Sequence, residues 1–475
     1  MPEPGPRPDP LSRVLEAGLA AVVVAAPLPF GAVSPAGRLA LEVAALSLLA
    51  IWIVRALALP TPLPPRLAAL GLAGLVLLGA LQCLPVGAAV TSVLSPLSLE
   101  TRRASQPEGA ALEAERRILS VDPALLEGKA TLSLDPQATA SALRTGAALV
   151  ALLIVATSVV ATRGPVVVCL ALLVAAAFQA LYGTLVLASG HPVIWHVPKT
   201  YYLDCATGTF VNRNHFAGFL AAALPPGLAL AVWSARELPV APRWRERLLA
   251  AASPAGIRTA FLGLLVATGI AGLLLSYSRA GIALGIGALL LTALCLGGRG
   301  WSRPVLGVVL AAVVGALPLA QIGAERLAAR YARAGDDFAS PAGRSAVWHD
   351  TLGMIRAAPL FGVGFGAFDA AYPIFRSPEV RLHYDHAHND PLQALAEGGL
   401  AAGVLLALVL APLLREIVRA LGRGRGTLAV GLAAGAAALL LHGLIDFNFH
   451  IPANAATGAI LAGTLLGLRW NEEAT

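Results

Sequence analysis

The sequence predicts an all-α polytopic membrane protein, with about twelve transmembrane helices and a large outer loop that bears short amphipathic helices. Composition is the first reason. Hydrophobic residues make up 57% of the 475-residue chain, charged residues make up 13%, and the mean hydropathy is +0.74. A water-soluble chain has no core that could bury so much apolar surface. The second reason is that apolar runs of about 20 residues, the length that crosses a bilayer, recur along the chain.

These apolar runs are rich in alanine, leucine and glycine, which favours close packing of helices in a membrane. Gly281 and Gly285 lie four residues apart and predict one such contact face. The predicted spans cover roughly 14–33, 38–57, 67–86, 141–161, 165–188, 214–235, 259–277, 280–297, 304–322, 392–413, 427–446 and 454–469.

Arginine placement predicts the orientation of these spans. Basic residues gather on one side, in runs such as "RELPVAPRWRERL" (236–248) and "REIVRALGRGRG" (415–426). The positive-inside rule makes this side cytoplasmic, and an even number of spans puts both termini there. Two long loops, 87–140 and 323–391, then lie outside. The net charge of +7 therefore marks the inner face of a membrane and does not indicate nucleic-acid binding.

The four cysteines have no metal-ligand spacing. Cys83 and Cys205 both fall near the predicted outer face, so a disulfide between them stays open as an alternative. We expect free thiols.

Polar residues gather at the predicted outer face in an otherwise apolar chain. In "TGTFVNRNHFAGFL" (207–220), Asn212, Arg213 and Asn214 stand at the predicted start of a helix, where free backbone N–H groups favour anions. Helix capping explains one asparagine but not the whole cluster. We therefore expect these residues to take part in substrate binding.

Arg279 in "LLLSYSRAGIAL" (273–284) lies in a short turn between two apolar runs. An arginine at such a depth is costly unless it meets an anion or lines a wet cavity. Snorkelling to lipid phosphates is the alternative. We favour an anion site, because arginine is suited to bidentate binding of phosphate.

Two further segments bear polar residues on the outer side. Asp446 belongs to "LHGLIDFNFHIPANA" (441–455), beside a predicted span. A carboxylate there costs free energy unless it has a partner, and we expect that partner to be Arg279 or a histidine. Arg344 belongs to "PAGRSAVWHDTLGMIRAAP" (341–359), which predicts an amphipathic helix with a basic face.

The stretch "RLHYDHAHNDPLQALAEGGLAAG" (381–403) concentrates three histidines at the mouth of an apolar segment. Zinc binding by His383, His386 and His388 is one interpretation, but the spacing fits no established zinc motif. Proton-coupled transport is another, but its groups belong near the bilayer midplane. We favour acid–base catalysis on a membrane-embedded substrate, because a histidine can remove a proton from a hydroxyl group.

The motifs "GTFVNRNHFAGFL", "SYSRAG", "PLFGVGFGAF" and "HAHNDPLQALAEGGL" together resemble the O-antigen ligase and polymerase family of bacterial membrane glycosyltransferases. The likeness extends over most of residues 140–455, and "TLSLDPQATASAL" (131–143) is similar to the segment before the shared domain in exopolysaccharide-locus members. The ligase pattern is a histidine, then Asn, Ser or Gln, nine residues and Gly-x-x-Gly. His388, Asn389 and Gly399 fit it, whereas Ala402 replaces the last glycine.

The resemblance implies a metal-independent enzyme without a cofactor in the bacterial inner membrane. Its donor would be an undecaprenyl-diphosphate-linked oligosaccharide. The acceptor would be a second lipid-linked glycan in a polymerase, or lipid A-core in a ligase, and these residues do not separate the two. A lipid-linked-glycan flippase, or another polysaccharide transporter without transferase activity, is the alternative function.

The mechanism expected from this resemblance is direct displacement with inversion of the anomeric centre. Arg279, helped by Arg213, would bind the diphosphate, and His388 would orient or deprotonate the acceptor hydroxyl. The predicted catalytic residues are His388, Arg279, Glu397 and His386. The predicted substrate-binding residues are Arg213, Asn212, Asn214, Asn389, Asp390, Arg344 and Asp446.

Three regions follow from these assignments. Residues 1–140 would hold the first spans and the first outer loop, and residues 141–455 the catalytic membrane domain with its loop 323–391. Residues 456–475 would form the last transmembrane helix and a cytoplasmic tail.

Overall fold

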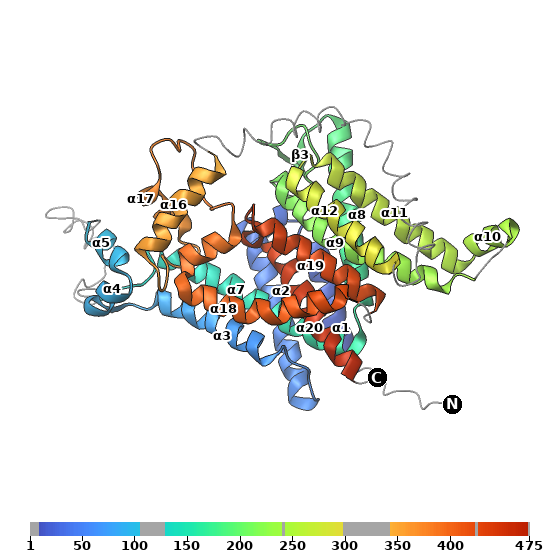
Figure 1. Cartoon of the computed structure of the whole chain (residues 1–475), viewed down its shortest axis with the longest axis horizontal. Coiled ribbons are helices and arrows are strands. Elements are labelled where there is room, and N and C mark those ends of the chain that lie inside the picture. The colour runs from blue at the N-terminus through green and yellow to red at the C-terminus, as the bar shows by residue number, and fades with distance from the viewer. Residues whose placement is uncertain (1–8, 105–128, 240–242, 298–342, 423–425, 474–475) are drawn as a thin grey trace. The chain divides into compact units, whose positions relative to one another are not determined.

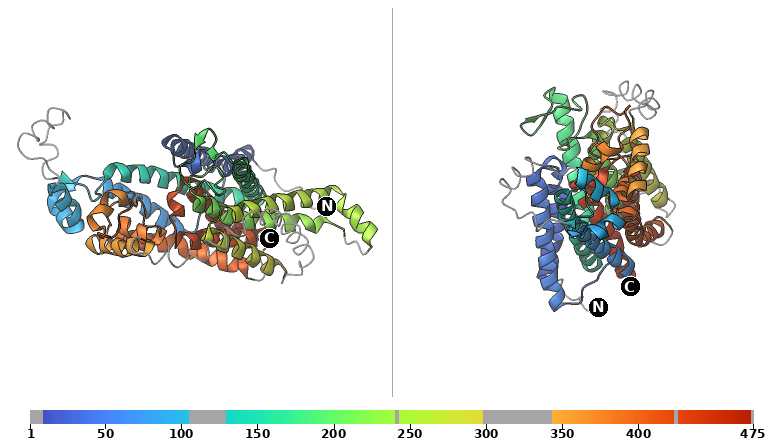
Figure 2. Two further views of the ribbon diagram at one scale, coloured as in Figure 1. Left: turned by 90° about the horizontal axis from the view of Figure 1, so that it is seen from above. Right: turned by 90° about the vertical axis from the view of Figure 1, so that its left-hand side faces the viewer.

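The computed structural model describes residues 9–104, 129–239, 243–297, 343–422 and 426–473, and most of the described residues are helical (Figure 1). Figure 2 shows the same helical architecture from two further sides. The strands among the described residues form two short antiparallel pairs. These pairs are β1 (Val86–Gly87) with β2 (Lys129–Ala130), and β3 (Val193–Ile194) with β4 (Val197–Pro198). The predicted all-α class is confirmed.

Eight described helices are long and apolar enough to cross a membrane, so the protein is a multi-pass membrane protein. Each matches a predicted span. They are α2 (Pro35–Ala58), α3 (Arg66–Cys83), α7 (Pro136–Arg163), α8 (Val166–Ser189), α9 (Arg213–Ser234), α11 (Pro254–Leu275), α12 (Arg279–Leu296) and α18 (Asp390–Leu421).

The other predicted spans have different outcomes. The last two correspond to apolar helices with shorter apolar stretches, α19 (Thr427–Gly443) and α20 (Pro452–Glu473). The predicted span 304–322 lies outside the described residues. The predicted span 14–33 is helical only in α1 (Pro10–Ala25), followed by the 3-10 turn η1 (Phe30–Ala32). The helix ends early because Pro27 and Pro29 cannot continue it.

Helix starts follow local sequence signals. Asp9 and Ser34 cap α1 and α2, in each case with a proline at the first helical turn. Asp135 Oδ1 accepts hydrogen bonds from the backbone N–H groups of Gln137 and Ala138, at 3.0 and 2.9 Å. Asp135 therefore caps α7, which begins at Pro136.

The chain divides into two compact units, which we describe separately. Unit 1 comprises residues 1–65, 148–334 and 412–475, and unit 2 comprises residues 66–147 and 335–411. The division falls inside the long helices α7 and α18.

In unit 1, helix α9 is almost entirely buried, and α8, α11, α12 and α19 all pack against it. Small residues allow these helices to approach closely. A Cβ atom added at Gly281 would lie 2.3 Å from the Cβ of Ala217, and one added at Gly285 would lie 3.4 Å from that of Ala221. The contact face predicted from these two glycines is confirmed. Unit 1 also holds η3 (Ala235–Glu237), α10 (Trp244–Ala251) and η5 (Asn448–His450).

In unit 2, a small helical layer packs around its own apolar core. The core includes Val347 and Met354 of α16 together with Phe368 and Tyr372 of α17. The predicted amphipathic segment 341–359 is thus helical over Arg344–Ala357. The shorter helices of this unit are α4 (Ala88–Leu94), α5 (Pro96–Ala104), α16 (Arg344–Ala357) and α17 (Phe368–Phe375).

Helix α18 is interrupted at Gly399, where the backbone has φ 62° and ψ −162°. The glycine-rich segment 359–366 fills the interruption. Val363 N–H donates to Ala396 O at 2.9 Å, and Leu400 N–H donates to Pro359 O at 2.8 Å. The predicted span 392–413 lies within α18, and the break at Gly399 was not predicted. The backbone groups released by the break are satisfied by another segment of the chain.

We predict that Gly399→Ala lowers stability by about 1–3 kcal/mol, because its φ/ψ is accessible essentially to glycine alone. An added Cβ would also lie 2.4 Å from the carbonyl carbon of Leu360. Thermal unfolding of the detergent-purified protein measures the effect. The control is Gly287→Ala, since a Cβ there meets nothing within 4 Å. Equal melting temperatures for the two variants would contradict the role of the break.

Candidate functional site

Two polar clusters contain the residues that the sequence singled out, one in each unit. In unit 1, helices α9 and α12 both begin with an arginine, Arg213 and Arg279 respectively. Asn212 caps α9 by accepting the Asn214 N–H at 2.8 Å, and Ser278 caps α12 by accepting the Gly281 N–H at 3.4 Å. The two arginines therefore occupy the first position of their helices, where the helix dipole is positive.

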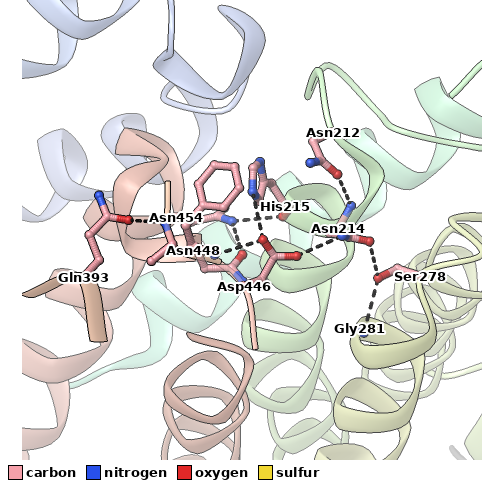
Figure 3. Close-up of polar contacts among 11 residues, drawn as sticks. Asn212, Asn214, His215, Ser278, Gly281, Gln393, Asp446, Asn448 and Asn454 are labelled. Atoms are coloured by element: carbon pink, nitrogen blue, oxygen red, sulfur yellow. Dashed lines mark hydrogen bonds and ion pairs between the residues drawn. The ribbon is translucent and has the colours of Figure 1, made fainter. Parts of the chain in front are cut away.

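A chain of side-chain hydrogen bonds joins these two helix starts (Figure 3). The Ser278 hydroxyl donates to Asn214 Oδ1 at 2.9 Å, and Asn214 Nδ2 donates to Asp446 Oδ2 at 2.8 Å. Asp446 is 1% exposed and also accepts the Phe447 N–H at 2.9 Å. The buried carboxylate thus fixes α9 directly and α12 through the asparagine.

A histidine lies beside this carboxylate, and a histidine was one of the two partners predicted for Asp446. His215 Nε2 is 3.7 Å from Asp446 Oδ1, and the imidazole meets the Phe447 ring edge to face at 4.5 Å between centroids. Both side chains are almost fully buried. His215 was not among the predicted site residues, although it belongs to the quoted motif that contains Arg213.

Two asparagines complete this buried cluster, and neither was predicted as a site residue. Asn454 Nδ2 donates to His215 O and to Asn448 Oδ1, both at 2.9 Å. Among the described residues, Asn448 Nδ2 and Asn454 Oδ1 have no hydrogen-bond partner although both asparagines are fully buried. The signal that could have found them was the recurrence of Asp and Asn in the apolar segment 441–455.

The Arg213 guanidinium lies over the ring of Tyr202, with 4.9 Å from Cζ to the ring centroid. This cation–π contact supports the side chain without cancelling its charge. Nearby, burial raises the pKa of the Cys205 thiol, and the charges of Arg213 and Lys199 act in the opposite direction. All four cysteines are free in the structure.

In unit 2, Glu397 is the buried carboxylate of the second cluster, with 3% of its surface exposed. Its Oε1 accepts from Gln393 Nε2 at 2.9 Å, and its Oε2 accepts from the Gly366 N–H at 2.9 Å. Gln393 Nε2 also lies 3.0 Å from His386 Nδ1. Predicted residues Glu397 and His386 are therefore brought together by Gln393, which the sequence analysis did not select.

A second glutamine that was not predicted supports this cluster from α3. Gln82 Nε2 donates to the carbonyl oxygens of Phe361 and Glu397, at 2.7 and 2.9 Å, and its Oε1 accepts the Phe365 N–H at 3.0 Å. Gln82 is fully buried. It therefore ties the glycine-rich turn to α18 at the break.

His388 has a left-handed backbone with φ 52°, which is uncommon for a residue other than glycine. Its ring meets Tyr384 edge to face at 5.8 Å between centroids. Asn389 Oδ1 accepts the Leu392 N–H at 2.9 Å, so this asparagine caps α18, and the next residue, the buried Asp390, begins the helix. His383 points elsewhere, because its Nε2 pairs with the exposed Asp369 at 3.0 Å.

Arg344 is the first residue of α16, which lies within the predicted amphipathic segment 341–359. The buried carboxylate of this helix is Asp350, which accepts from the Tyr372 hydroxyl at 2.9 Å and from the Ser377 N–H at 3.0 Å. Burial, and then the hydrogen bond to Asp350, raise the pKa of Tyr372. These contacts hold α16 and α17 together and supply no acid–base group.

Within the described part of the chain, no three His, Cys, Asp or Glu side chains form a group that could hold a metal ion. The groups available for chemistry are the arginines at helix starts in unit 1 and the histidines of the segment that Gln393 connects to the buried Glu397 in unit 2.

Comparison with known families bears on both clusters. Residues 262–407 match the family model described as O-Antigen ligase. Over these residues the chain is similar to the O-antigen ligase family. The family resemblance of the sequence motifs is thereby confirmed. No curated protein matches the chain. The matched segment of the O-antigen ligase domain includes Arg279, His386, His388, Gln393 and Glu397, whereas Arg213 and Asp446 lie outside it.

We predict that Asn214 and Asp446 are energetically coupled, because removing either one leaves a buried polar partner unsatisfied. A double-mutant cycle of Asn214→Ala and Asp446→Ala measures the coupling through melting temperatures. Each single variant should be destabilised by about 1–3 kcal/mol, and the double variant by much less than the sum. Additive effects would show that the hydrogen bond between the two side chains contributes nothing.

Proposed function

We propose that the protein is a membrane glycosyltransferase of the O-antigen ligase or polymerase type. In this proposal it moves a glycan from an undecaprenyl-diphosphate donor to an acceptor hydroxyl on the periplasmic side of the bacterial inner membrane. The O-antigen ligase domain supports the reaction class. The observation that carries the proposal is the pair of arginines at the starts of α9 and α12, linked through Asn214 to one buried carboxylate.

Two helix starts with two arginines suit a diphosphate. Each helix start presents backbone N–H groups and the positive end of its dipole, and arginine adds a planar donor pair. Asp446 does not oppose this role, because its carboxylate is buried and accepts hydrogen bonds from Asn214 and from a backbone N–H. Arg213 and Arg279 would stabilise the charge that develops on the departing diphosphate.

The acid–base step is assigned to His388 in unit 2. The acceptor oxygen attacks the anomeric carbon while the bond from that carbon to the diphosphate oxygen breaks. The bonding electrons leave with undecaprenyl diphosphate, and the hydroxyl proton passes to the imidazole. A single displacement inverts the anomeric centre. The left-handed backbone of His388 supports this assignment, because strained residues concentrate at functional sites.

A reconstituted transfer assay tests the proposal. Purified protein in lipid vesicles receives an undecaprenyl-diphosphate oligosaccharide alone, and then together with a lipid A-core acceptor. Longer lipid-linked glycan from the donor alone identifies a polymerase, and product that requires the second acceptor identifies a ligase. Flux of lipid-linked glycan across the bilayer without transfer would overturn the enzyme proposal in favour of a flippase.

Arg279→Ala should lower kcat/KM at least about 10²-fold, since removal of one donor to the developing charge costs about that much. Arg279→Lys should recover only part of the activity, because an ammonium group cannot bind bidentately. The matched control is Arg258→Gln, which removes an exposed arginine of unit 1 that pairs with Glu237. Initial rates and melting temperatures are measured together. A rate loss in the control as large as in Arg279→Ala would contradict the assignment.

His388→Ala should lower kcat by about 10²–10⁴-fold while the KM for the donor changes little, because the lost group acts on the acceptor hydroxyl. The control is His383→Asn, which removes an exposed histidine five residues earlier that pairs with Asp369. Steady-state kinetics with both substrates gives the result. If the donor KM rises while kcat is unchanged, His388 is a binding residue and not the base.

A further inference from the structure

Gln393 is a fully buried amide in the first turns of α18, and each of its polar atoms has a defined partner. Its Oε1 lies 3.0 Å from the backbone nitrogen of Ala387. Its Nε2 lies 2.9 Å from Glu397 Oε1 and 3.0 Å from His386 Nδ1. Three different partners therefore surround one neutral side chain.

The donor properties of these partners determine the orientation of the amide. A backbone N–H can only donate, so the atom that faces Ala387 must be the carbonyl oxygen of Gln393. The NH₂ group then faces Glu397 and His386. An NH₂ group has two hydrogens, and here it has two acceptors.

The protonation state of His386 follows from this orientation. Because Gln393 donates to Nδ1, that nitrogen must accept and carries no proton. The imidazole is then neutral, with its proton on Nε2. A proton on Nδ1 would require the amide to turn over. That rotation would break the bond to Ala387 and set the Gln393 oxygen against the Glu397 carboxylate.

The far end of this chain of hydrogen bonds is also fixed. Glu397 Oε2 accepts the Gly366 N–H of the glycine-rich turn, and the Glu397 carbonyl accepts from Gln82 and from the Gly364 N–H. The carboxylate therefore cannot rotate away from Gln393 without breaking its hydrogen bond to the Gly366 N–H.

Two other carboxylates of unit 2 have partners of their own. Asp350 of α16 accepts from Tyr372 and from Ser377, and Asp369 of α17 pairs with His383. Within its own segment, His386 has Tyr384, Asp385, His388 and Asp390 as its titratable neighbours in sequence. Glu397 is the carboxylate that Gln393 joins to the ring, and the amide separates the two.

We propose that Gln393 is a positioning residue that holds His386 as the neutral Nε2–H tautomer, so that His386 serves glycan transfer as a hydrogen-bond donor and not as a base. The inference rests on the proposed function and gives its two histidines different roles. His388 takes the proton from the acceptor hydroxyl. His386 contributes the N–H of Nε2, a donor that keeps the same charge throughout the reaction.

The first test observes the tautomer directly, by ¹⁵N NMR of histidine-labelled protein in lipid nanodiscs. His386→Gln identifies the resonances of His386 by their loss. The wild type should show Nδ1 unprotonated and Nε2 protonated at neutral pH. In Gln393→Glu, a carboxylate replaces the NH₂ group beside Nδ1, and His386 should become doubly protonated. An imidazolium or an Nδ1–H tautomer in the wild type overturns the proposal.

The second test is kinetic and uses the same variants. His386→Gln keeps a side-chain N–H donor and should retain activity within about 10-fold of wild type, whereas His386→Ala and His388→Gln should lose about 10²-fold or more. Gln393→Glu should move the pH–rate profile to higher pH by about one unit or more, and the isosteric Gln393→Met should lower the rate without that shift. Equal losses in His386→Gln and His386→Ala would overturn the donor role.

The two tests separate this inference from the proposed function. The NMR result needs no substrate, so it stands if no donor glycan supports transfer. Conversely, transfer that proceeds with His386 doubly protonated would leave the glycosyltransferase proposal intact and remove the role of Gln393.

Discussion

The interruption of α18 at Gly399 is the constraint on which the acid–base cluster depends. A continuous helix would satisfy its own carbonyl groups and would have no need of the turn at 359–366. Because the helix is broken, the carbonyls of Ala396 and Glu397 accept hydrogen bonds from that turn. The turn in turn presents the Gly366 N–H to the Glu397 side chain, so the backbone break fixes the carboxylate. Gln393, His386 and the cap at Asn389 then follow within less than three turns of helix.

Both clusters solve the problem of a buried carboxylate in the same way. In unit 1 the amide of Asn214 donates to Asp446, and in unit 2 the amide of Gln393 donates to Glu397. A neutral amide donates a hydrogen bond to the carboxylate, and it also bonds a second group and so fixes the position of that group. That second group is Ser278 at the start of α12, or His386 beside α18.

The sequence was sufficient for features that depend on local chemistry. Apolar runs gave the helices, and the Asp135–Pro136 pair gave a helix start, because span length and capping are properties of short segments. The early end of α1 also has a local cause, because Pro27 and Pro29 lie inside the predicted span 14–33. The apolar composition of that stretch outweighed the two prolines in the prediction. The break at Gly399 was not predictable in this way, because a glycine inside a span is ordinary and only its partner turn makes the break stable.

The polar partners differ in how far the sequence could have revealed them. Gln393 and Glu397 are four residues apart on one helix, so their contact was available from helical periodicity. Asn214 and Asp446 are 232 residues apart, and the sequence of neither segment indicates that it contacts the other. A buried hydrogen bond between distant segments is selected by the complete fold, in which each polar group must find some partner. This explains why the sequence indicated Asn214 and Asp446 separately but not the hydrogen bond between them, and why it indicated neither Gln82 nor Gln393. Arginine, histidine and carboxylate side chains are marked in a sequence by the cost of burying their charge, whereas the two glutamines hold the geometry of the cluster in unit 2 without any charge.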